Sequence, residues 1–212
     1  MAIKKCIHVV ATAGFEPEMC AITLPNLKAY ADKIGADFNV MSKRTRVDWP
    51  IVCEKQQIYE IGRDYDWNVS IDADILIHPS MGDFTEWHPP THVGNWWYYE
   101  ASKVFDTKNN HYFIKDGRDY GVVECFVATS KLTHDLWEPL PGSFDDYKHI
   151  FLDKFYWRAG EYCLSHNLAK YSLKISGVFK GMDDVYHINT TSRKVKNAAQ
   201  LAYNKLKEWE SL

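Results

Sequence analysis

The sequence predicts a single α/β domain built on a mostly parallel, twisted sheet with helices on its faces. Apolar runs alternate with helical patterns in the first 78 residues, which indicates parallel strands joined by right-handed crossovers. The 212 residues, 46% apolar and 25% charged, are enough to bury one sizeable core. Polar loops follow the first and third runs, where such sheets bind ligands.

The first part of the chain supplies this alternation. Pro25 is suited to the first position of a helix because its fixed φ is already helical, and Gly35 follows the expected end of that helix. Gly62 is placed to end the next helical stretch. The predicted order is a strand at 7–11, a helix at 25–34, a strand at 37–41, a helical stretch at 51–61 and a strand at 68–71.

The second part of the chain is less regular. Residues 79–119 lose periodicity, and a long irregular stretch inside a domain is usually functional. Beyond it we predict a strand at 122–129, helical patterns at 130–137 and 146–170, a strand at 172–176 and a helix at 194–212. We divide the domain into a nucleotide-binding half at 1–78, a sugar and acceptor half at 79–192, and a C-terminal helix at 193–212. That helix is a terminal cap or a linker to a further domain.

Composition narrows the class of protein. The net charge of −3 gives no general attraction to nucleic acid or to an anionic membrane. No apolar stretch approaches the roughly 18–20 residues of a membrane span, and the N-terminus lacks a signal-peptide layout. We therefore expect a cytoplasmic protein. The cysteines form no CxxC pair and are expected to be reduced core residues: Cys6, Cys20, Cys53, Cys125 and Cys163.

A pair of carboxylates follows the third predicted strand. Asp72 and Asp74 are two residues apart, so both side chains face the same side of an extended segment, and Ala73 lets a ligand approach the backbone. Their flanks are apolar, so two ionised carboxylates would repel each other unless a cation lay between them. A second Asp-x-Asp triplet, at Asp64 and Asp66, lies in a polar turn and is expected to be solvated.

Four segments together resemble the GT-A class of nucleotide-sugar glycosyltransferases. Residues 65–77 resemble its Asp-x-Asp signature between hydrophobic runs, and residues 120–128 resemble the glycine-containing strand that lines the sugar site. Residues 157–165 resemble the acidic helix start that faces the acceptor, and residues 185–189 resemble the C-terminal segment whose His completes the metal site. The overall likeness is to the compact glycosyltransferase domain of chlorella viruses, which builds capsid glycans.

The resemblance implies a GT-A (Rossmann-like) fold and an activity. The enzyme would transfer a sugar from a nucleotide-diphosphate donor, expected to be a UDP-linked hexose or deoxyhexose, to an acceptor glycan. Mn²⁺ or Mg²⁺ would be the cofactor. Asp74 would bind the cation directly, and Asp72 would share it or bind the ribose hydroxyls. His187 would add a nitrogen ligand, which fits Mn²⁺ better than Ca²⁺; otherwise it is a histidine packed beside Tyr186.

Five further residues are expected at the nucleotide. Thr12 and Gly14 end the first strand and are placed to contact the base and ribose. Lys55 reaches a phosphate or stabilises the leaving group, or else is a solvated lysine on a helix face. Arg193 and Lys194 clamp the diphosphate when a C-terminal loop closes, or simply open the charged last helix.

The catalytic base has three candidates. Glu161 is the first choice, with Glu124 and Asp119 behind it, because a base needs a pKa raised by a partly apolar site. The alternative role of Glu161 is to complement the charge of a helix N-terminus. Tyr162 stands where the class usually has Asp, so the base stays open, as does the choice between inversion and retention.

The irregular segment contains a run of four aromatic residues. Their rings would stack on an acceptor glycan or a nucleobase, or else belong to the core, since consecutive strand residues point to both faces. They are Trp96, Trp97, Tyr98 and Tyr99.

Three other functions compete with this hypothesis. A sugar-nucleotide nucleotidyltransferase would have a Gly-rich basic loop after the first strand, whereas residues 12–18 are acidic and poor in Gly. A non-catalytic carbohydrate-binding domain would explain the aromatic residues but not an ordered Asp, Asp and His set. A glycosyltransferase acting on modified viral DNA would share the chemistry, and the acidic net charge argues only mildly against it.

Overall fold

The computed structural model describes residues 2–12, 14–96, 98–106, 120–176, 184–188 and 197–211. Its central sheet has six strands in the order β2-β1-β3-β8-β5-β9. β1 is parallel to β2 and β3, and β5 is parallel to β9, whereas β8 runs antiparallel to β3 and β5. The predicted mostly parallel sheet is confirmed. Its strands are β1 (Lys5–Val10), β2 (Asp37–Met41), β3 (Trp67–Ile71), β5 (His92–Asn95), β8 (Phe126–Ser130) and β9 (Lys174–Ser176).

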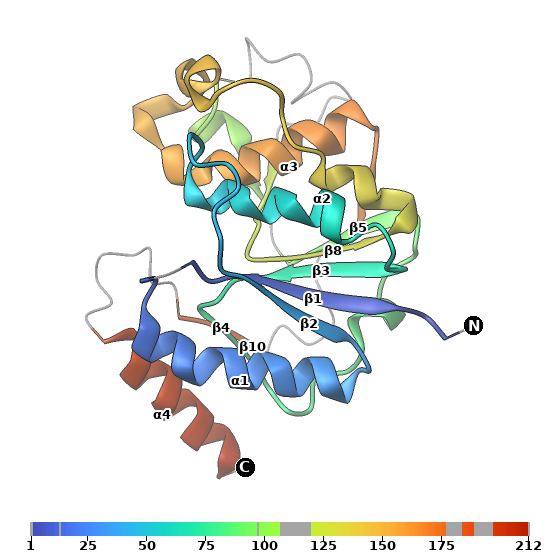
Figure 1. Cartoon of the computed structure of the whole chain (residues 1–212), viewed down its shortest axis with the longest axis vertical. Coiled ribbons are helices and arrows are strands. Elements are labelled where there is room, and N and C mark those ends of the chain that lie inside the picture. Colours follow the sequence, from blue (N-terminus) through green and yellow to red (C-terminus); the bar gives the residue numbers. More distant parts are fainter. Residues whose placement is uncertain are drawn as a thin grey trace.

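Helices cover both faces of this sheet. α1 (Pro17–Lys33) and α4 (Ala198–Glu210) pack together below it in Figure 1, and α2 (Ile58–Ile61) and α3 (Ala159–Lys170) lie above it. A 3₁₀ helix, η1 (Ile51–Gln57), leads into α2 and contacts α3. The remaining described 3₁₀ turns are η2 (Phe84–Glu86), η3 (Ala101–Lys103), η5 (Lys131–Trp137), η6 (Phe144–Asp146), η7 (Lys148–Ile150), η8 (Leu152–Lys154) and η9 (Tyr156–Arg158).

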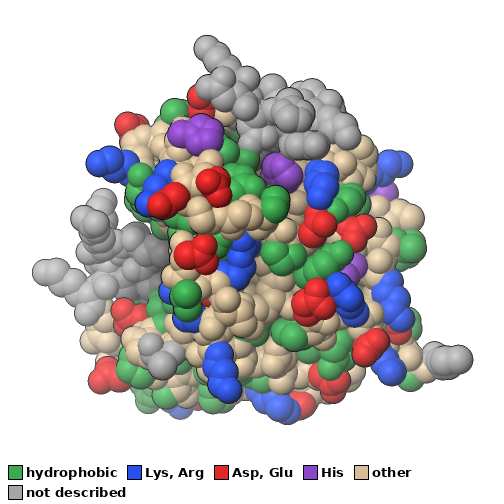
Figure 2. Space-filling model, turned by 45° about the horizontal axis from the view of Figure 1, so that its top comes forward, with side chains coloured by type: hydrophobic (Ala, Val, Ile, Leu, Met, Phe, Trp, Pro, Cys, Tyr) green, Lys and Arg blue, Asp and Glu red, His purple; other side chains and the backbone are tan. Residues whose placement is uncertain are grey.

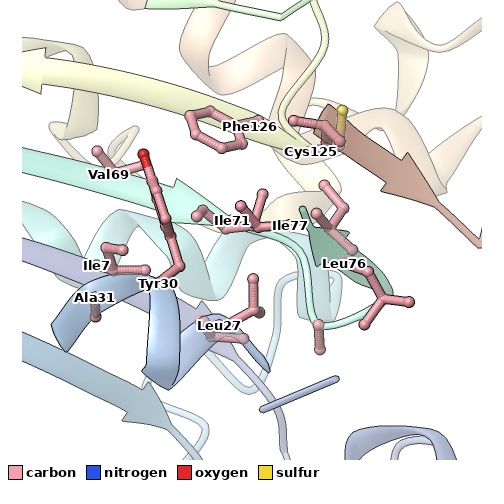
Figure 3. Packing of buried hydrophobic residues seen from close by; sticks show 14 of the residues in the cluster. Ile7, Leu27, Tyr30, Ala31, Val69, Ile71, Leu76, Ile77, Cys125 and Phe126 are labelled. Carbon is pink, nitrogen blue, oxygen red and sulfur yellow. The ribbon is translucent and has the colours of Figure 1, made fainter. Parts of the chain in front are cut away.

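The main core lies between α1 and the sheet. Leu27, Tyr30 and Ala31 occupy one face of α1, because residues three and four apart lie on the same side of a helix. Figure 3 shows them pointing toward Ile7 of β1 and Val69 of β3, which are fully buried. Burial of each large apolar side chain contributes about 1.5–3 kcal/mol, so this contact fixes α1 on the sheet.

Two small antiparallel pairs complete the architecture. β4 (Ile75–Ile77) follows β3 after a short turn and pairs with β10 (Val185–His187). β6 (Tyr98–Glu100) pairs with β7 (Tyr120–Val122). The β4–β10 pair matters most for function, because it brings a distant part of the chain beside the Asp-x-Asp turn.

The predicted start of the first helix was wrong. The helix begins at Pro17, so Pro25 lies inside it and not at its first position. Pro17 takes the first-turn position instead. Burial of Met19, Thr23 and Leu27 against the sheet outweighs the roughly 3 kcal/mol that a proline costs in a helix interior.

The predicted strand at 122–129 was also wrong in one respect. It is divided between β7 and β8, with a turn around Glu124 that neither Gly nor Pro signals. The irregular stretch at 79–119 contains β5 and β6, and the helical pattern at 146–170 is an α-helix only from Ala159 onward. The strand at 37–41, the helical stretch at 51–61 and a helix within 194–212 are confirmed. The strand predicted at 172–176 is present but begins at Lys174.

The state of the cysteines and the distribution of surface charge agree with what the composition predicts. All five cysteines are free and buried. Figure 2 shows positive and negative side chains interspersed over the face in view. None of the helices in the described ranges combines the length and apolar character that crossing a bilayer requires.

Candidate active site

The Asp-x-Asp turn is held in place by the neighbouring strand of the sheet and by α1. The amide of Asp72 donates to the carbonyl of Cys125 at 2.8 Å, which ties the turn to the end of β8. From α1, the Thr23 hydroxyl donates to the carbonyl of Ala73 at 2.6 Å. The amide of Ile75 donates back to the carbonyl of Asp72 at 3.2 Å and closes the turn. The two carboxylates therefore leave the sheet from a fixed backbone.

The β4–β10 pair brings His187 to these carboxylates. His187 is opposite Ile75 in the ladder, and the amide of Ile188 donates to the carbonyl of Asp74 at 2.9 Å. Asn26 of α1 secures β4 by exchanging two hydrogen bonds with the backbone of Ile77, at 2.7 and 2.9 Å. As a result, His187 Nε2 lies 3.3 Å from Asp74 Oδ1.

Asp72, Asp74 and His187 fit a divalent cation. One ligand atom from each lies within 4.8 Å of the others, and within the described ranges no other group of three His, Cys, Asp or Glu residues does so. Burial and then the neighbouring Asp74 charge raise the pKa of Asp72, although Lys55 opposes them. Burial lowers the pKa of His187, but its hydrogen bond to Asp74 and the Asp74 charge outweigh burial and raise it. The two carboxylate oxygens suit Mn²⁺ or Mg²⁺, and the imidazole nitrogen favours Mn²⁺ of the two.

Lys55 lies buried behind this group. Its Nζ is 2.5 Å from Asp72 Oδ1 and 3.5 Å from Glu124 Oε2, and it donates to the Glu124 carbonyl at 3.1 Å. Burial alone would lower the pKa of this ammonium, but the charges of Asp72 and Glu124 raise it. The interpretation of Lys55 as a solvated lysine is therefore wrong; it is an internal counter-ion that links two carboxylates.

Glu124 occupies the turn between β7 and β8. Asn95 shapes this turn by donating from Nδ2 to the carbonyl of Val123 at 2.6 Å. The Glu124 side chain is buried against Gly160 in the first turn of α3. Burial raises its pKa to about 8, although Lys55 opposes the shift. The turn that the sequence did not signal is thus what aims Glu124 toward Lys55.

Glu161, in the first turn of α3, carries the second carboxylate of this part of the site. It is buried, and its Oε2 accepts a hydrogen bond from Arg158 Nη1 at 2.5 Å. Burial raises the pKa of Glu161 to about 7, against the opposing charge of Arg158. Glu124 and Glu161 are therefore two protonatable carboxyl groups on the same side of the sheet as Lys55.

The predicted nucleotide-binding residues are only partly described. Thr12 and Gly14 follow β1, which is parallel to β3, so they lie at the same edge of the sheet as Asp72. Gly14 has a φ of 89°, in the left-handed region that favours glycine. Arg193 and Lys194 lie outside the described ranges, as does Asp119, the third candidate for the catalytic base, and the roles of all three stay predictions.

Trp96 is not an exposed ring on which an acceptor glycan or a nucleobase could stack, which was one of our two interpretations. It is 8% exposed and belongs to the main core cluster, so the core interpretation is confirmed. Its ring meets the His187 ring edge-on, with centroids 6.0 Å apart. Trp97 lies outside the described residues, as do the side chains of Tyr98 and Tyr99.

Sequence reasoning missed the residues that support the site. Thr23, Asn26 and Asn95 hold the backbone around the carboxylates, and isolated polar residues of this kind carry no sequence signal. Gly160 had a weak signal, since a glycine in a helical segment has a packing or functional reason when the backbone does not require it.

Comparison with known proteins places the chain near several solved structures. No protein-family model and no curated sequence matches it. One similar structure is a glycosyltransferase involved in glycosylation of the major capsid of PBCV-1, with 13% identity and a TM-score of 0.41 over 62% of this chain. The match spans 65% of that neighbour's length.

Two further structures are similar. One is a mutant of the Drosophila beta1,4-galactosyltransferase 7 in complex with manganese, UDP-Gal and xylobiose, with 12% identity and a TM-score of 0.47 over 95% of this chain and 79% of the other. The other is a protein from STIV, with 14% identity and a TM-score of 0.34 over 62% of this chain and 67% of the other. The neighbours thus include glycosyltransferases, the class that the sequence resembles.

Proposed function

We propose that this chain is a metal-dependent glycosyltransferase that moves a sugar from a nucleotide-diphosphate donor to an acceptor glycan. The observation that carries the proposal is the meeting of Asp72, Asp74 and His187 at the carboxyl end of β3. The buried carboxyls of Glu124 and Glu161 on the α3 side of the sheet add groups able to take a proton. The donor class is a UDP-linked hexose or deoxyhexose, and the acceptor class suggested by the sequence resemblance is a capsid glycan.

Asp72, Asp74 and His187 would hold Mn²⁺ or Mg²⁺. When bound, such a cation supplies Lewis-acid stabilisation and orientation to a diphosphate leaving group. Lys55 favours the ionised form of Asp72 and fixes one of its oxygens at 2.5 Å, which leaves the other oxygen for the cation. This assigns Lys55 to the carboxylates first, with a phosphate contact as a further prediction.

The other residues of the chain bind and orient the substrates. Thr12 and Gly14 would contact the base and ribose from the end of β1, and Arg193 and Lys194 would contact the diphosphate. Glu161, Glu124 and Asp119 are the candidates to take the proton of the acceptor hydroxyl. A base with a raised pKa suits this task near neutral pH.

The test is release of nucleoside diphosphate from a panel of nucleotide sugars, with and without Mn²⁺. We expect turnover that requires the cation and that falls about 10²–10⁴-fold in Asp74→Ala, the range that several kcal/mol of Lewis-acid stabilisation supplies. Asp64→Ala is the matched control, because Asp64 belongs to the other Asp-x-Asp triplet and is exposed. Turnover without metal that Asp74→Ala leaves unchanged would contradict the proposal.

A further inference from the structure

Gly160 lies in close contact with the carboxylate of Glu124. A Cβ added at Gly160 would lie 2.0 Å from Glu124 Oε2, 2.7 Å from its Cδ and 2.9 Å from its Oε1. The backbone of Gly160 is not in the left-handed region, so its conformation admits any residue. Alanine would also favour the helix, because glycine is a poor residue in a helix interior. The presence of glycine at position 160 is therefore explained by the Glu124 carboxylate, which occupies the space that a Cβ would need.

The Glu124 carboxylate has a free hydrogen-bonding position. Glu124 is 6% exposed, and its Oε2 has no hydrogen-bond partner, with Lys55 Nζ 3.5 Å away. Buried polar atoms are nearly always hydrogen-bonded, so a carboxylate oxygen that has a long ion pair to Lys55 and no hydrogen bond can accept a further donor supplied by a ligand. A hydroxyl is such a donor.

Glu161 differs from Glu124 in this respect. Its Oε2 already accepts a charge-assisted hydrogen bond from Arg158 at 2.5 Å. A carboxylate held by a guanidinium gains less from taking a proton, because protonation removes the charge that strengthens that bond. The geometry therefore separates the two candidates that the sequence left open.

We propose that Glu124 is the catalytic base that takes the proton of the acceptor hydroxyl, and that Gly160 is its positioning residue. The inference rests on the proposed function. In the step, the acceptor oxygen bonds to the anomeric carbon while the bond from that carbon to the diphosphate oxygen breaks. Its electron pair leaves with the nucleoside diphosphate, and the hydroxyl proton passes to Glu124 and then to water.

Three charged groups face Glu124 from the elements packed against it. They are Lys55 of η1, Asp72 at the end of β3 and Glu161 of α3. Burial is the largest influence and raises the pKa of Glu124 to about 8, with the two carboxylates adding to it and Lys55 opposing it. A base of this kind is active when deprotonated, so the rate should rise with pH along an acid limb that belongs to Glu124.

A double-mutant cycle on the full chain tests the inference. We expect Gly160→Ala to displace the flexible carboxylate and lower turnover at least about 10-fold, and Glu124→Ala to lower it about 10²–10⁴-fold, the usual share of a general base. Both variants should lose the acid limb of the pH profile and keep the donor KM within about threefold. Adding Gly160→Ala to Glu124→Ala should change nothing further, because the clash is gone.

Gly82→Ala is the matched control, since its Cβ would meet the Trp87 ring at an ordinary 3.4 Å. Full activity of Gly160→Ala, or an equal further loss when it is added to Glu124→Ala, would overturn the inference. A wild-type pH profile in Glu124→Ala would overturn it as well. If Asp74→Ala still abolishes turnover in that case, the proposed function stands; if the parent chain turns over no nucleotide sugar, both fail.

Discussion

Two parts of the site handle negative charge in opposite ways. We call the group of Asp72, Asp74 and His187 the metal corner, and the pair of Glu124 and Glu161 the carboxylate corner. In the metal corner, the side chains of Asp72 and His187 are 26% and 28% exposed, and that of Asp74 is 7% exposed. Those of the carboxylate corner are 8% and 9% exposed.

The difference shows what each corner lacks. The metal corner sets two carboxylates beside one imidazole, and we propose that an external cation completes it. The carboxylate corner already has cations from the chain, Lys55 and Arg158, and what it accommodates is a proton. Lys55 also contacts Asp72 and thereby connects the two corners.

Removing that connection should have the largest effect. Lys55→Met leaves the buried Glu124 and the partly exposed Asp72 without their cation, and breaking a buried pair in this way costs about 3–5 kcal/mol. We expect the free energy of unfolding by urea to fall by that amount. Lys28→Met is the control, because Lys28 pairs with Asp32 on the surface, where a pair contributes about 0.3–0.5 kcal/mol. Equal losses in the two variants would show that Lys55 is no internal counter-ion.

The metal corner should depend on its nitrogen ligand. His187→Ala should weaken Mn²⁺ binding at least about 100-fold, since even the groups that support metal ligands change affinity by 10–100-fold. Calorimetric titration of the metal-free protein measures this. His149→Ala, at an exposed histidine, should bind normally. Unchanged affinity in His187→Ala would remove the histidine from the ligand set.

The carboxylate corner should make stability depend on pH. Burial raises the pKa of Glu124 to about 8 and that of Glu161 to about 7, above the ordinary 4.5. Between about pH 4.5 and pH 8, the folded state therefore binds more protons than the unfolded state. The contribution of these two carboxyls to stability is fully present below about pH 4.5 and is lost as the pH rises through about 7 and 8.

Unfolding in urea with a metal chelator, from pH 5 to 8, checks this dependence. We expect Glu124→Gln to flatten the decline by roughly 3–4 kcal/mol, because the raised pKa spans about 2.5 units of this window and one pKa unit corresponds to about 1.4 kcal/mol. Glu86→Gln is the control, since Glu86 lies in η2, on none of the elements that form the two corners. An unchanged slope in Glu124→Gln would show that this carboxyl is ionised at neutral pH.

The smallest effect should come from the support of the metal corner. Thr23→Val keeps the shape of the side chain but removes the hydrogen bond to the Ala73 carbonyl, which contributes about 0.5–1.5 kcal/mol. We expect a loss of stability of that size and a weakening of Mn²⁺ binding of less than about 10-fold. A loss of binding as large as in His187→Ala would mean that Thr23 does more than hold the turn.

The contrast between the corners also explains what the sequence could predict. Asp72 and Asp74 are local: an apolar strand followed by two alternate carboxylates is visible in one short segment. His187 was assigned to the same site only from the family resemblance, because its position depends on the β4–β10 ladder. The contact between Glu124 and Gly160 joins a turn to a helix packed on it, and no local pattern encodes such packing.

The fold shows the same division. Strands such as 37–41 follow from their apolar patterns and were predicted with correct bounds. Pro25 misled the prediction because burial of one helix face outweighed a local preference. The direction of β8 could not be predicted, because antiparallel pairing with β3 depends on the path of the intervening chain.

The most direct test is the position of manganese in a crystal grown with Mn²⁺ and UDP. The anomalous difference map should show a peak about 2–2.5 Å from a carboxylate oxygen of Asp74 and from His187 Nε2, with UDP phosphate oxygens on the same ion. A manganese peak elsewhere, or UDP bound away from Asp72 and Asp74, would contradict the account.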